Sequence, residues 1–345
     1  MGKFKYLITR LKDMDYKKMF KTIDKVYGKT KKNRIGIFFD MVGTMLHHQA
    51  GYTDYYSFGM YDMTEEEKKT ILTRGRNNTY VATLNSKEYW HLFDNKNEFN
   101  ELFKDYLKRD WLYLEQASFE EFEKFLKGKD YIIAKPNNDS GGHGIEKIKV
   151  GELSNKELYD YLKNKNLTLL EEVVKQHKDL AKLYPGSVNT LRIITILHND
   201  KVSFVTAFLR IGNRGFVDNT SSGGMLSMID LEKGKILYPA CDGELKVYER
   251  HPVTNVPIKG LVIPYFKEAK ELCVKLATNE KIKDHLKYIA WDIAVTDNGP
   301  LVIEGNPYPG YYYQFPIHTP NKIGIVPRFE EILNDGSNKE NTKEN

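Results

Sequence analysis

The sequence is poor in cysteine, with Cys241 and Cys273 the only two among 345 residues. Two cysteines cannot form a disulfide framework, and neither has the neighbouring Cys or His ligands that a zinc site needs. Also missing are an uncharged apolar run of roughly 18 residues, as a membrane-spanning helix needs, and an apolar signal core after the first residues. We therefore expect reduced cysteines in a cytoplasmic protein that is neither inserted nor exported.

The remaining composition is that of an ordinary globular protein. Hydrophobic residues make up 41% of the chain and charged residues 29%, with 25 Gly and 12 Pro. These proportions exclude collagen-like, disordered and disulfide-scaffold classes. The length predicts two or three folded units.

Positive charge is concentrated at the start of the chain. Residues 1–34 hold twelve Lys or Arg and three Asp, a balance of +9, so the rest carries −4 of the net +5. Apolar residues recur there every three or four positions, which predicts an amphipathic helical arm. We favour packing of its apolar face on the body of the protein over peripheral contact with an anionic membrane at the inner face. Nucleic acid binding is not expected, because the basic residues lack interleaved surface aromatics.

Hydrophobic patterning predicts a mixed α+β protein whose second half is a large, mostly antiparallel sheet. Helices are expected at 63–74, 97–107, 119–126, 156–163 and 264–278. Strands are expected at 131–134, 145–150, 167–174, 191–197, 201–211, 224–230, 235–237, 289–295 and 301–304. Residues 334–345 are polar and are predicted to be a disordered tail.

Two short motifs suggest other enzymes but are incomplete. Asp40 lies in FFDMVGT, which resembles the start of haloacid-dehalogenase-type phosphatases, yet Val42 replaces their acid–base carboxylate. We therefore interpret Asp40 as a structural residue at a strand end. The tripeptide GKT at 28–30 resembles the end of a Walker motif, but Ile23 stands where its first glycine should be.

The strongest local signal is the segment 135–145, KPNNDSGGHGI. Lys135 ends an apolar strand, and a glycine-rich loop follows before the next strand. A cation beside free backbone N–H groups is a combination that holds polyphosphate. The alternative is a glycine-rich hairpin loop with a surface lysine.

Carboxylates near the C-terminus give a second signal. A turn at 297–300 pairs the flanking strands, and a register symmetric about Asn298 sets Asp292 opposite Glu304. Asn306 shares a face with Glu304. Three oxygen ligands in an apolar context suit Mg²⁺. The alternative, an acid at a strand edge followed by an Asn-Pro turn, leaves Asp292 unexplained.

Two arginines, Arg192 and Arg210, lie in apolar strands, where an unpaired guanidinium is costly. A phosphoryl group or a substrate carboxylate would pair such a fork. A structural salt bridge to one of the same carboxylates is an equal alternative.

Together these motifs resemble the ATP-grasp superfamily from about residue 96 to 309. The resemblance comprises Lys-Pro with its glycine loop, EEVV at 171–174, the strand arginines and Asp…Glu-x-Asn in a hairpin. Finer features resemble the sugar-transfer-associated branch, namely SVNTLR at 187–192, VDN at 217–219 with GG at 223–224, and IEGNP at 303–307.

The resemblance implies a fold in which nucleotide lies between a small α/β subdomain (116–174) and a larger, mostly antiparallel subdomain (175–333). The basic arm (1–34) and an N-terminal domain (35–115) precede them. ATP and Mg²⁺ are the implied cofactors. Glu171, Glu172, Val173 and Val174 would form the adenine hinge, Gln176 or His177 would reach the ribose, and Lys96 and Lys135 would contact phosphates. Gly141, Gly142, His143 and Gly144 would close over the phosphates, although His143 departs from the usual glycine run. Asp292, Glu304 and Asn306 would hold Mg²⁺.

The function implied is an ADP-forming ligase that activates a small-molecule carboxylate as an acyl phosphate for attack by an amine or sugar acceptor. Lys135, Arg192 and Arg210 would be its catalytic residues, and cell-surface polysaccharide synthesis or modification would be its setting. One alternative is a sugar kinase on the same fold, with Asp218 or Asp242 as base. A second is a non-enzymatic, membrane-associated assembly protein that binds ATP.

Overall fold

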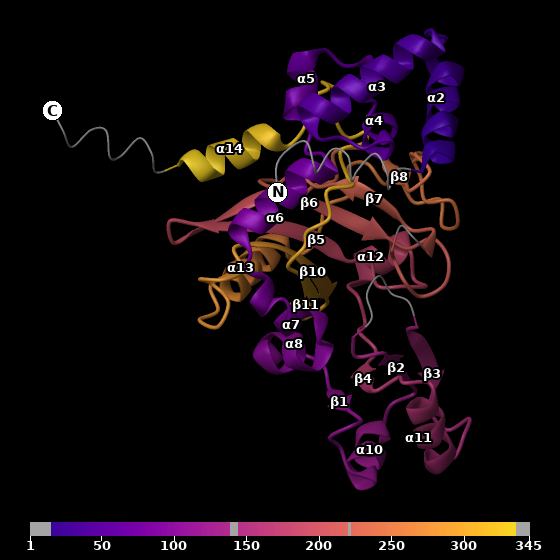
Figure 1. The fold of residues 1–345 in the computed structure, drawn as a ribbon. Coiled ribbons are helices and arrows are strands. Elements are labelled where there is room, and N and C mark those ends of the chain that lie inside the picture. Colours follow the sequence, from indigo (N-terminus) through magenta and orange to yellow (C-terminus); the bar gives the residue numbers. More distant parts are fainter. Residues whose placement is uncertain (1–14, 139–143, 220–221, 336–345) are drawn as a thin grey trace, which may run out of the picture. The chain divides into compact units, whose positions relative to one another are not determined.

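The computed structural model describes residues 15–138, 144–219 and 222–335 (Figure 1). The chain divides into two compact units. The first comprises residues 15–79 of the described chain with Gln314–Pro327, and the second comprises Tyr80–Tyr313 with residues 328–335. From residue 336 onward, the tail predicted to be disordered lies outside the described residues.

The first unit is helical. Its elements are α2 (Tyr16–Thr30), α3 (Arg34–His48), α4 (Tyr52–Ser57), η1 (Met60–Asp62) and α5 (Glu65–Thr70), and α6 (Arg74–Leu84) leads into the second unit. Asp15 caps α2 by accepting a hydrogen bond from the backbone N–H of Lys18. Met19, Ile23 and Val26 are buried on α2. The apolar face of the described part of the arm therefore packs within its own unit, as we favoured.

The expectation of a strand ending at Asp40 is wrong, because Arg34–His48 is a helix. Apolar residues lie on both faces of this helix, so the segment shows neither strand alternation nor a single helical stripe. The structural role of Asp40 is nevertheless clear. Its two carboxylate oxygens accept hydrogen bonds from Lys68 Nζ and from the Tyr55 hydroxyl, each 2.6 Å away.

The smaller sheet of the second unit has the order β1-β4-β2-β3 and is antiparallel throughout. Its strands are β1 (Trp111–Tyr113), β2 (Tyr131–Lys135), β3 (Glu146–Lys149) and β4 (Leu169–Glu172). Helices α10 (Phe119–Leu126) and α11 (Asn155–Asn164) share a core with it, which includes Phe122, Ile132 and Leu158. Each helix starts at a serine capping box, Ser118 and Ser154.

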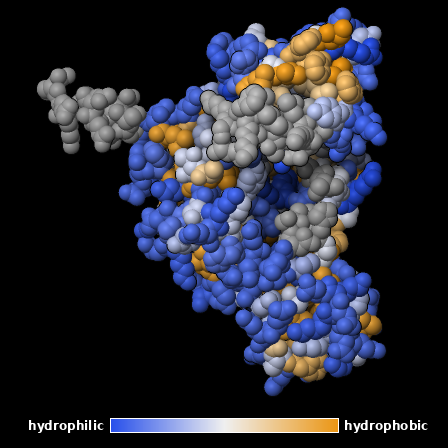
Figure 2. Space-filling view, in the orientation of Figure 1, coloured by the Kyte–Doolittle hydropathy of each residue, from blue (hydrophilic) through white to orange (hydrophobic). Residues whose placement is uncertain are grey.

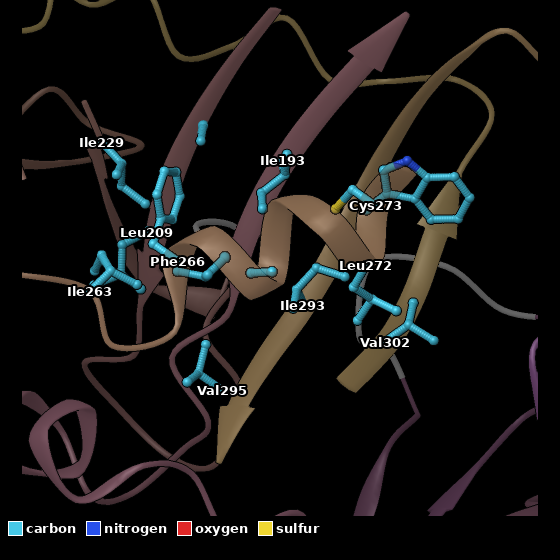
Figure 3. Packing of buried hydrophobic residues seen from close by; sticks show 14 of the residues in the cluster. Ile193, Leu209, Ile229, Ile263, Phe266, Leu272, Cys273, Ile293, Val295 and Val302 are labelled. Atoms are coloured by element: carbon cyan, nitrogen blue, oxygen red, sulfur yellow. The ribbon is translucent and has the colours of Figure 1, made fainter. Parts of the chain in front are cut away.

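The larger sheet has the order β11-β10-β5-β6-β7-β8-β9 and is also antiparallel. Its strands are β5 (Leu191–His198), β6 (Lys201–Ile211), β7 (Met225–Met228), β8 (Ala240–Asp242), β9 (Val247–Tyr248), β10 (Tyr288–Thr296) and β11 (Gly299–Asn306). Helix α13 (Phe266–Ala277) packs on one face, where Cys273 and Leu272 meet Ile193 and Ile293 (Figure 3). The mostly antiparallel sheet predicted for the second half is confirmed.

The remaining helices of the second unit are η2 (Lys87–Tyr89), α7 (His91–Asp94), α8 (Lys96–Leu102), α9 (Lys104–Leu107), α12 (Lys178–Leu183) and most of α14 (Val326–Asn334). The single helix expected at 97–107 is broken at Phe103, whose fully buried ring packs against Trp291. The helix expected at 63–74 ends at Thr70, although its capping box of Thr64 and Glu67 is correct. The strand expected at 235–237 is reduced to isolated bridges. Among the described helices, none is long and apolar enough to cross a membrane.

Packing of α2 predicts unequal effects for two neighbouring apolar residues. Ile23 is buried and Phe20 is 57% exposed. Replacing Ile23 by Ala should lower the free energy of unfolding of the first unit by about 2 to 5 kcal/mol, since it removes buried methyl groups and leaves a cavity. Phe20→Ala, the matched control, should change it little. Urea titrations would measure both, and equal transition midpoints would contradict packing of the arm.

Candidate functional site

The main cavity of the second unit has a volume of about 400 Å³ and is lined by residues of both sheets. It brings together most of the predicted site residues, namely Lys96, Lys135, Glu171, Glu172, Val173, Val174, Arg210, Asp292 and Glu304. A second cavity of about 330 Å³ is lined by Asn306 and shares Lys96, Lys135, Glu171, Ile303 and Glu304 with the first. Glu304 and Lys135 therefore lie at the wall that the two cavities have in common.

Strand alternation places the charged residues on the cavity face of the larger sheet. On β10, Trp291 and Ile293 belong to the apolar core shared with α13, so Asp292 between them points to the opposite face. Asp292 pairs with Glu304 on β11 and with Arg192 on β5. A row of three charged side chains thus crosses three adjacent strands.

The predicted pairing of Asp292 with Glu304 is confirmed, but the hairpin reaches it differently. Thr296 pairs with Gly299, so the turn contains only Asp297 and Asn298, and the register then shifts between Asp292 and Ile293. Ile303 is the extra residue, because Ile293 pairs with Val302 and Asp292 with Glu304. The bulge therefore sets Asp292 opposite Glu304, the same pairing that the longer turn predicted at 297–300 would have given.

Asp292 is held by both predicted arginines. Arg192 Nη2 donates to Asp292 Oδ2 over 2.9 Å while its Nε lies against the other oxygen, and Arg210 Nη1 donates to Oδ2 over 2.6 Å. Arg210 also pairs with Asp218 at 3.0 Å, and Asp218 is fixed in turn by the backbone N–H of Thr190. The salt-bridge alternative therefore holds for both arginines, and only Arg210 also lines the main cavity.

The facing carboxyl groups of Asp292 and Glu304 perturb each other. Burial and the nearby charge of Glu304 together raise the pKa of Asp292 to about 6, against the lowering effect of Arg192 and Arg210. Burial also acts to raise the pKa of Glu304, but the hydrogen bond from Asp292 and the two arginines outweigh burial and lower it. Of the two carboxyl groups, Glu304 is thus the one whose ionised form the site stabilises.

A second buried ion network connects the two sheets. Glu171 on β4 binds Lys135 Nζ at 2.5 Å and Arg109 Nη2 at 2.9 Å. Arg109 also donates to the carbonyls of Val302 and Ile303 over 2.7 and 3.4 Å, at the bulge of β11. Burial acts to raise the pKa of Glu171, but the charges of Arg109 and Lys135 hold it well below its ordinary value. The carboxylate of Glu171 therefore orients Lys135, a contact that the resemblance, which implies a place for Glu171 in an adenine hinge, does not predict.

Sequence reasoning missed Arg109. It stands in the polar segment before β1, a three-residue strand too short to give a pattern. Only its burial beside Glu171, with a side chain 2% exposed, reveals its role.

Of three further predicted residues, Lys96 and Gln176 line the main cavity and His177 does not. Lys96 begins α8 and donates to the carbonyls of Pro136 and Asn137 over 3.0 and 3.3 Å. The side chain of Gln176 binds backbone atoms between α12 and β5. His177 caps α12 and lines neither cavity, so the structure does not bring it to the site.

Of the predicted glycine loop, only Gly144 is described, with a φ of +68°. That left-handed conformation suits glycine, because it has no Cβ. Gly141, Gly142 and His143 lie outside the described residues.

The oxygen ligands expected for Mg²⁺ fit a cation only as a mixed set. Within the described chain, no three His, Cys, Asp or Glu side chains are clustered to hold a metal. Glu304, however, has no basic partner within ion-pair distance among the described residues, and the buried Asn306 Nδ2 has no hydrogen-bond partner there. A carboxylate without a described counterion is compatible with a divalent cation, and the ligand from Asn306 would be its amide oxygen, because the Nδ2 group only donates hydrogen bonds.

Comparison with known proteins gives a family match. Residues 75–334 match the model of the sugar-transfer associated ATP-grasp family. Similar solved structures include D-alanine–D-alanine ligase from Helicobacter pylori, with 18% identity and a TM-score of 0.41 over 70% of this chain and 61% of that chain. Another is N5-carboxyaminoimidazole synthetase from Staphylococcus aureus complexed with ADP, with 14% identity and a TM-score of 0.42 over 70% of this chain and 54% of that one.

The chain thus spans less than two thirds of the length of either of these enzymes. No curated protein sequence gave a significant match. The family match, by contrast, extends over more than half of the chain and includes both cavities and both ion networks. The protein therefore belongs to the sugar-transfer-associated ATP-grasp family.

Proposed function

We propose that the protein is an ADP-forming ligase that activates a small-molecule carboxylate with ATP and transfers the acyl group to an amine or sugar acceptor. We place the reaction in the cytoplasm, in the synthesis or modification of a cell-surface polysaccharide. Family membership supports the use of ATP. The observation that carries the proposal is the convergence of Lys135, Arg210 and Glu304 on the wall of one cavity.

The cavity offers an apolar part and a charged part. Val173, Val174 and Ile133 contribute apolar surface, which suits adenine, and the backbone of the two valines, just after β4, would meet the edge of the base. Lys135 and Lys96 line the charged part, where they would face the phosphates. Adenine and triphosphate would thus occupy opposite parts of the same cavity.

Glu304, with Asp292 and Asn306, would hold Mg²⁺. When bound, the cation supplies positive charge that neutralises the transferring phosphoryl group. The salt bridges of Asp292 to Arg192 and Arg210 leave Glu304 as the main anionic ligand. Arg210 is fixed by two carboxylates and so presents its remaining donors to the cavity without reorganisation.

In the proposed reaction a carboxylate oxygen of the substrate attacks the γ-phosphorus of ATP, and ADP leaves. The acceptor amine then attacks the carbonyl carbon of the acyl phosphate, loses a proton, and displaces inorganic phosphate. Lys135 stabilises negative charge on the phosphoryl oxygens, and Arg210 holds the substrate carboxylate. Neither step requires a nucleophilic side chain from the protein.

The kinase alternative needs a free carboxylate base. Asp218 is paired with Arg210 and accepts hydrogen bonds from Thr190. Asp242 accepts hydrogen bonds from two backbone N–H groups and from the Tyr248 hydroxyl. Both carboxylates are thus engaged in structural contacts, which favours the ligase. An assembly protein that only binds ATP would have little use for Arg210 and Glu304 on the same wall.

The central experiment is a screen for ADP release with mixtures of carboxylic acids and amines or amino sugars. We expect release to depend on a carboxylate, because the acyl phosphate cannot form without one. Formation of inorganic phosphate should depend on the acceptor as well. Phosphorylation of a sugar hydroxyl in the absence of any carboxylic acid would instead establish the kinase.

Glu304→Gln should lower kcat by roughly a hundredfold or more, because it removes the charge that holds the cation at the transferring phosphoryl group. Nucleotide binding should persist in part, since the apolar wall is unchanged. Glu232→Gln, at an exposed site in the same unit, is the matched control and should retain full activity. Turnover of Glu304→Gln at the unmodified rate would refute the cation site.

Lys135→Ala should weaken ATP binding by roughly tenfold or more, because a charge-assisted hydrogen bond contributes about 1.5 to 3 kcal/mol. Calorimetry with a non-hydrolysable ATP analogue would measure the change. Lys165 is an exposed residue at the end of α11, and Lys165→Ala should bind the analogue like the unmodified protein. Equal affinities for the two variants would show that Lys135 does not contact the phosphates.

A further inference from the structure

Helix α3 has a second apolar face, which packs against no described residue that would bury it. Its inner face buries Ile37, Met41 and Thr44. On the other side, Ile35 is 67% exposed, Phe39 65% and Leu46 48%. Partly exposed Phe38, Val42 and Met45 lie between them. We call these six residues the α3 stripe, and Figure 2 shows hydrophobic side chains gathered along this helix.

The α3 stripe follows helical periodicity and is continuous. Its members recur at spacings of three and four from Ile35 to Leu46, which places them on one side of the helix. The charged residue within this span, Asp40, is engaged by Lys68 and Tyr55. Scattered apolar residues on a surface need no explanation, but a continuous row along a helix marks an interaction site.

Uncompensated positive charge accompanies the α3 stripe. Six lysines of α2 and the turn before α3 have no carboxylate within ion-pair distance among the described residues, namely Lys17, Lys21, Lys25, Lys29, Lys31 and Lys32. Lys31 and Lys32 directly precede the helix. Lys25 and Lys29 lie over the Tyr56 ring, and Lys32 Nζ donates to the Tyr61 carbonyl, so these contacts leave their positive charge in place. Apolar side chains next to lysines without a described carboxylate partner are the two features that an anionic bilayer surface accommodates together.

We propose that the α3 stripe lies in the headgroup region of an anionic membrane, with the lysines of α2 and the following turn on the lipid phosphates. Helix α3 has 15 residues and is therefore about 22 Å long, shorter than a spanning helix. It would lie along the interface rather than cross it. This places the lipid contact on a face that includes residues beyond the basic arm, while the apolar face of α2 remains buried in the first unit.

The test is co-sedimentation of the full chain with vesicles of phosphatidylcholine, with and without phosphatidylglycerol. We expect binding only to the anionic vesicles, and weaker binding as salt rises, because exposed charges are screened over about 10 Å at 0.1 M ionic strength. Equal binding to neutral vesicles would contradict the role of the lysines.

Two double variants compare loss of apolar side chains from the α3 stripe with the same kind of loss at exposed positions elsewhere. Ile35→Ala with Phe39→Ala should weaken vesicle binding by roughly tenfold or more, since both side chains lose apolar carbons that would enter the lipid. Val253→Ala with Val262→Ala is the matched control, because these valines are 66% and 63% exposed in the second unit. The control should bind vesicles like the unmodified protein.

A charge variant tests the second component. Lys31→Gln should weaken binding roughly fivefold, since a lysine near an anionic surface contributes about 1 kcal/mol. Lys233→Gln, an exposed lysine in the second unit, should have no effect.

Two results would overturn the proposal. If residues 1–14 cover the stripe, the full chain would ignore vesicles, and Ile35→Ala with Phe39→Ala would lower the melting temperature. If a second copy covers it, the same pair would convert a dimer into a monomer in light scattering, again without vesicle binding. The proposed lipid contact requires instead an unchanged melting temperature and an unchanged oligomeric state.

Discussion

The burial of Asp292 is the constraint around which the cavity wall is organised. A buried carboxylate between Trp291 and Ile293 on β10, the second strand of a seven-stranded sheet, cannot stay charged without partners. Arg192 supplies one from the neighbouring strand, and Arg210 supplies another from β6. Arg210 then needs a further anion, which Asp218 provides. Removing Asp292 would leave Arg192 without an ion-pair partner among the described residues, and removing Arg210 would leave Asp218 without one, so these two side chains hold the network together.

Arg109 connects the two sheets by compensating a second buried carboxylate. It pairs with Glu171 of the smaller sheet and donates to the two carbonyls that flank the bulge in the larger one. Glu171 in turn positions Lys135. The guanidinium of Arg109 thus contacts both the carboxylate that orients Lys135 and the strand that carries Glu304. The guanidinium is planar and carries five donors on three nitrogens, so it reaches the carboxylate on one sheet and the carbonyls on the other in one fixed geometry.

Alternation and spacing were sufficient to predict much of this arrangement. The strands around Arg192, Arg210 and Asp292 follow a clear hydrophobic pattern, and their polar residues stand out because burial would penalise them. Arg109 and the helix at α3 could not be predicted in the same way. A buried arginine in a polar segment has no periodic signature, and a helix with two apolar faces lacks the single stripe that indicates a helix. His177 was misplaced for a related reason, since its position after the hinge did not reveal that it caps α12.

Because Ile303 is an extra residue in β11, the pairing of Asp292 with Glu304 does not depend on the turn length alone. In a regular hairpin, adding or removing one residue at the turn rotates every later side chain to the opposite face of the sheet. Here the bulge takes up one residue between the turn and Glu304, and Arg109 occupies the carbonyls that the irregular pairing leaves open. A one-residue insertion at Asp297 and Asn298 could therefore be balanced by loss of the bulge, with Glu304 still opposite Asp292. The hairpin can tolerate variation in its loop that a strictly regular ladder would transmit to the carboxylates.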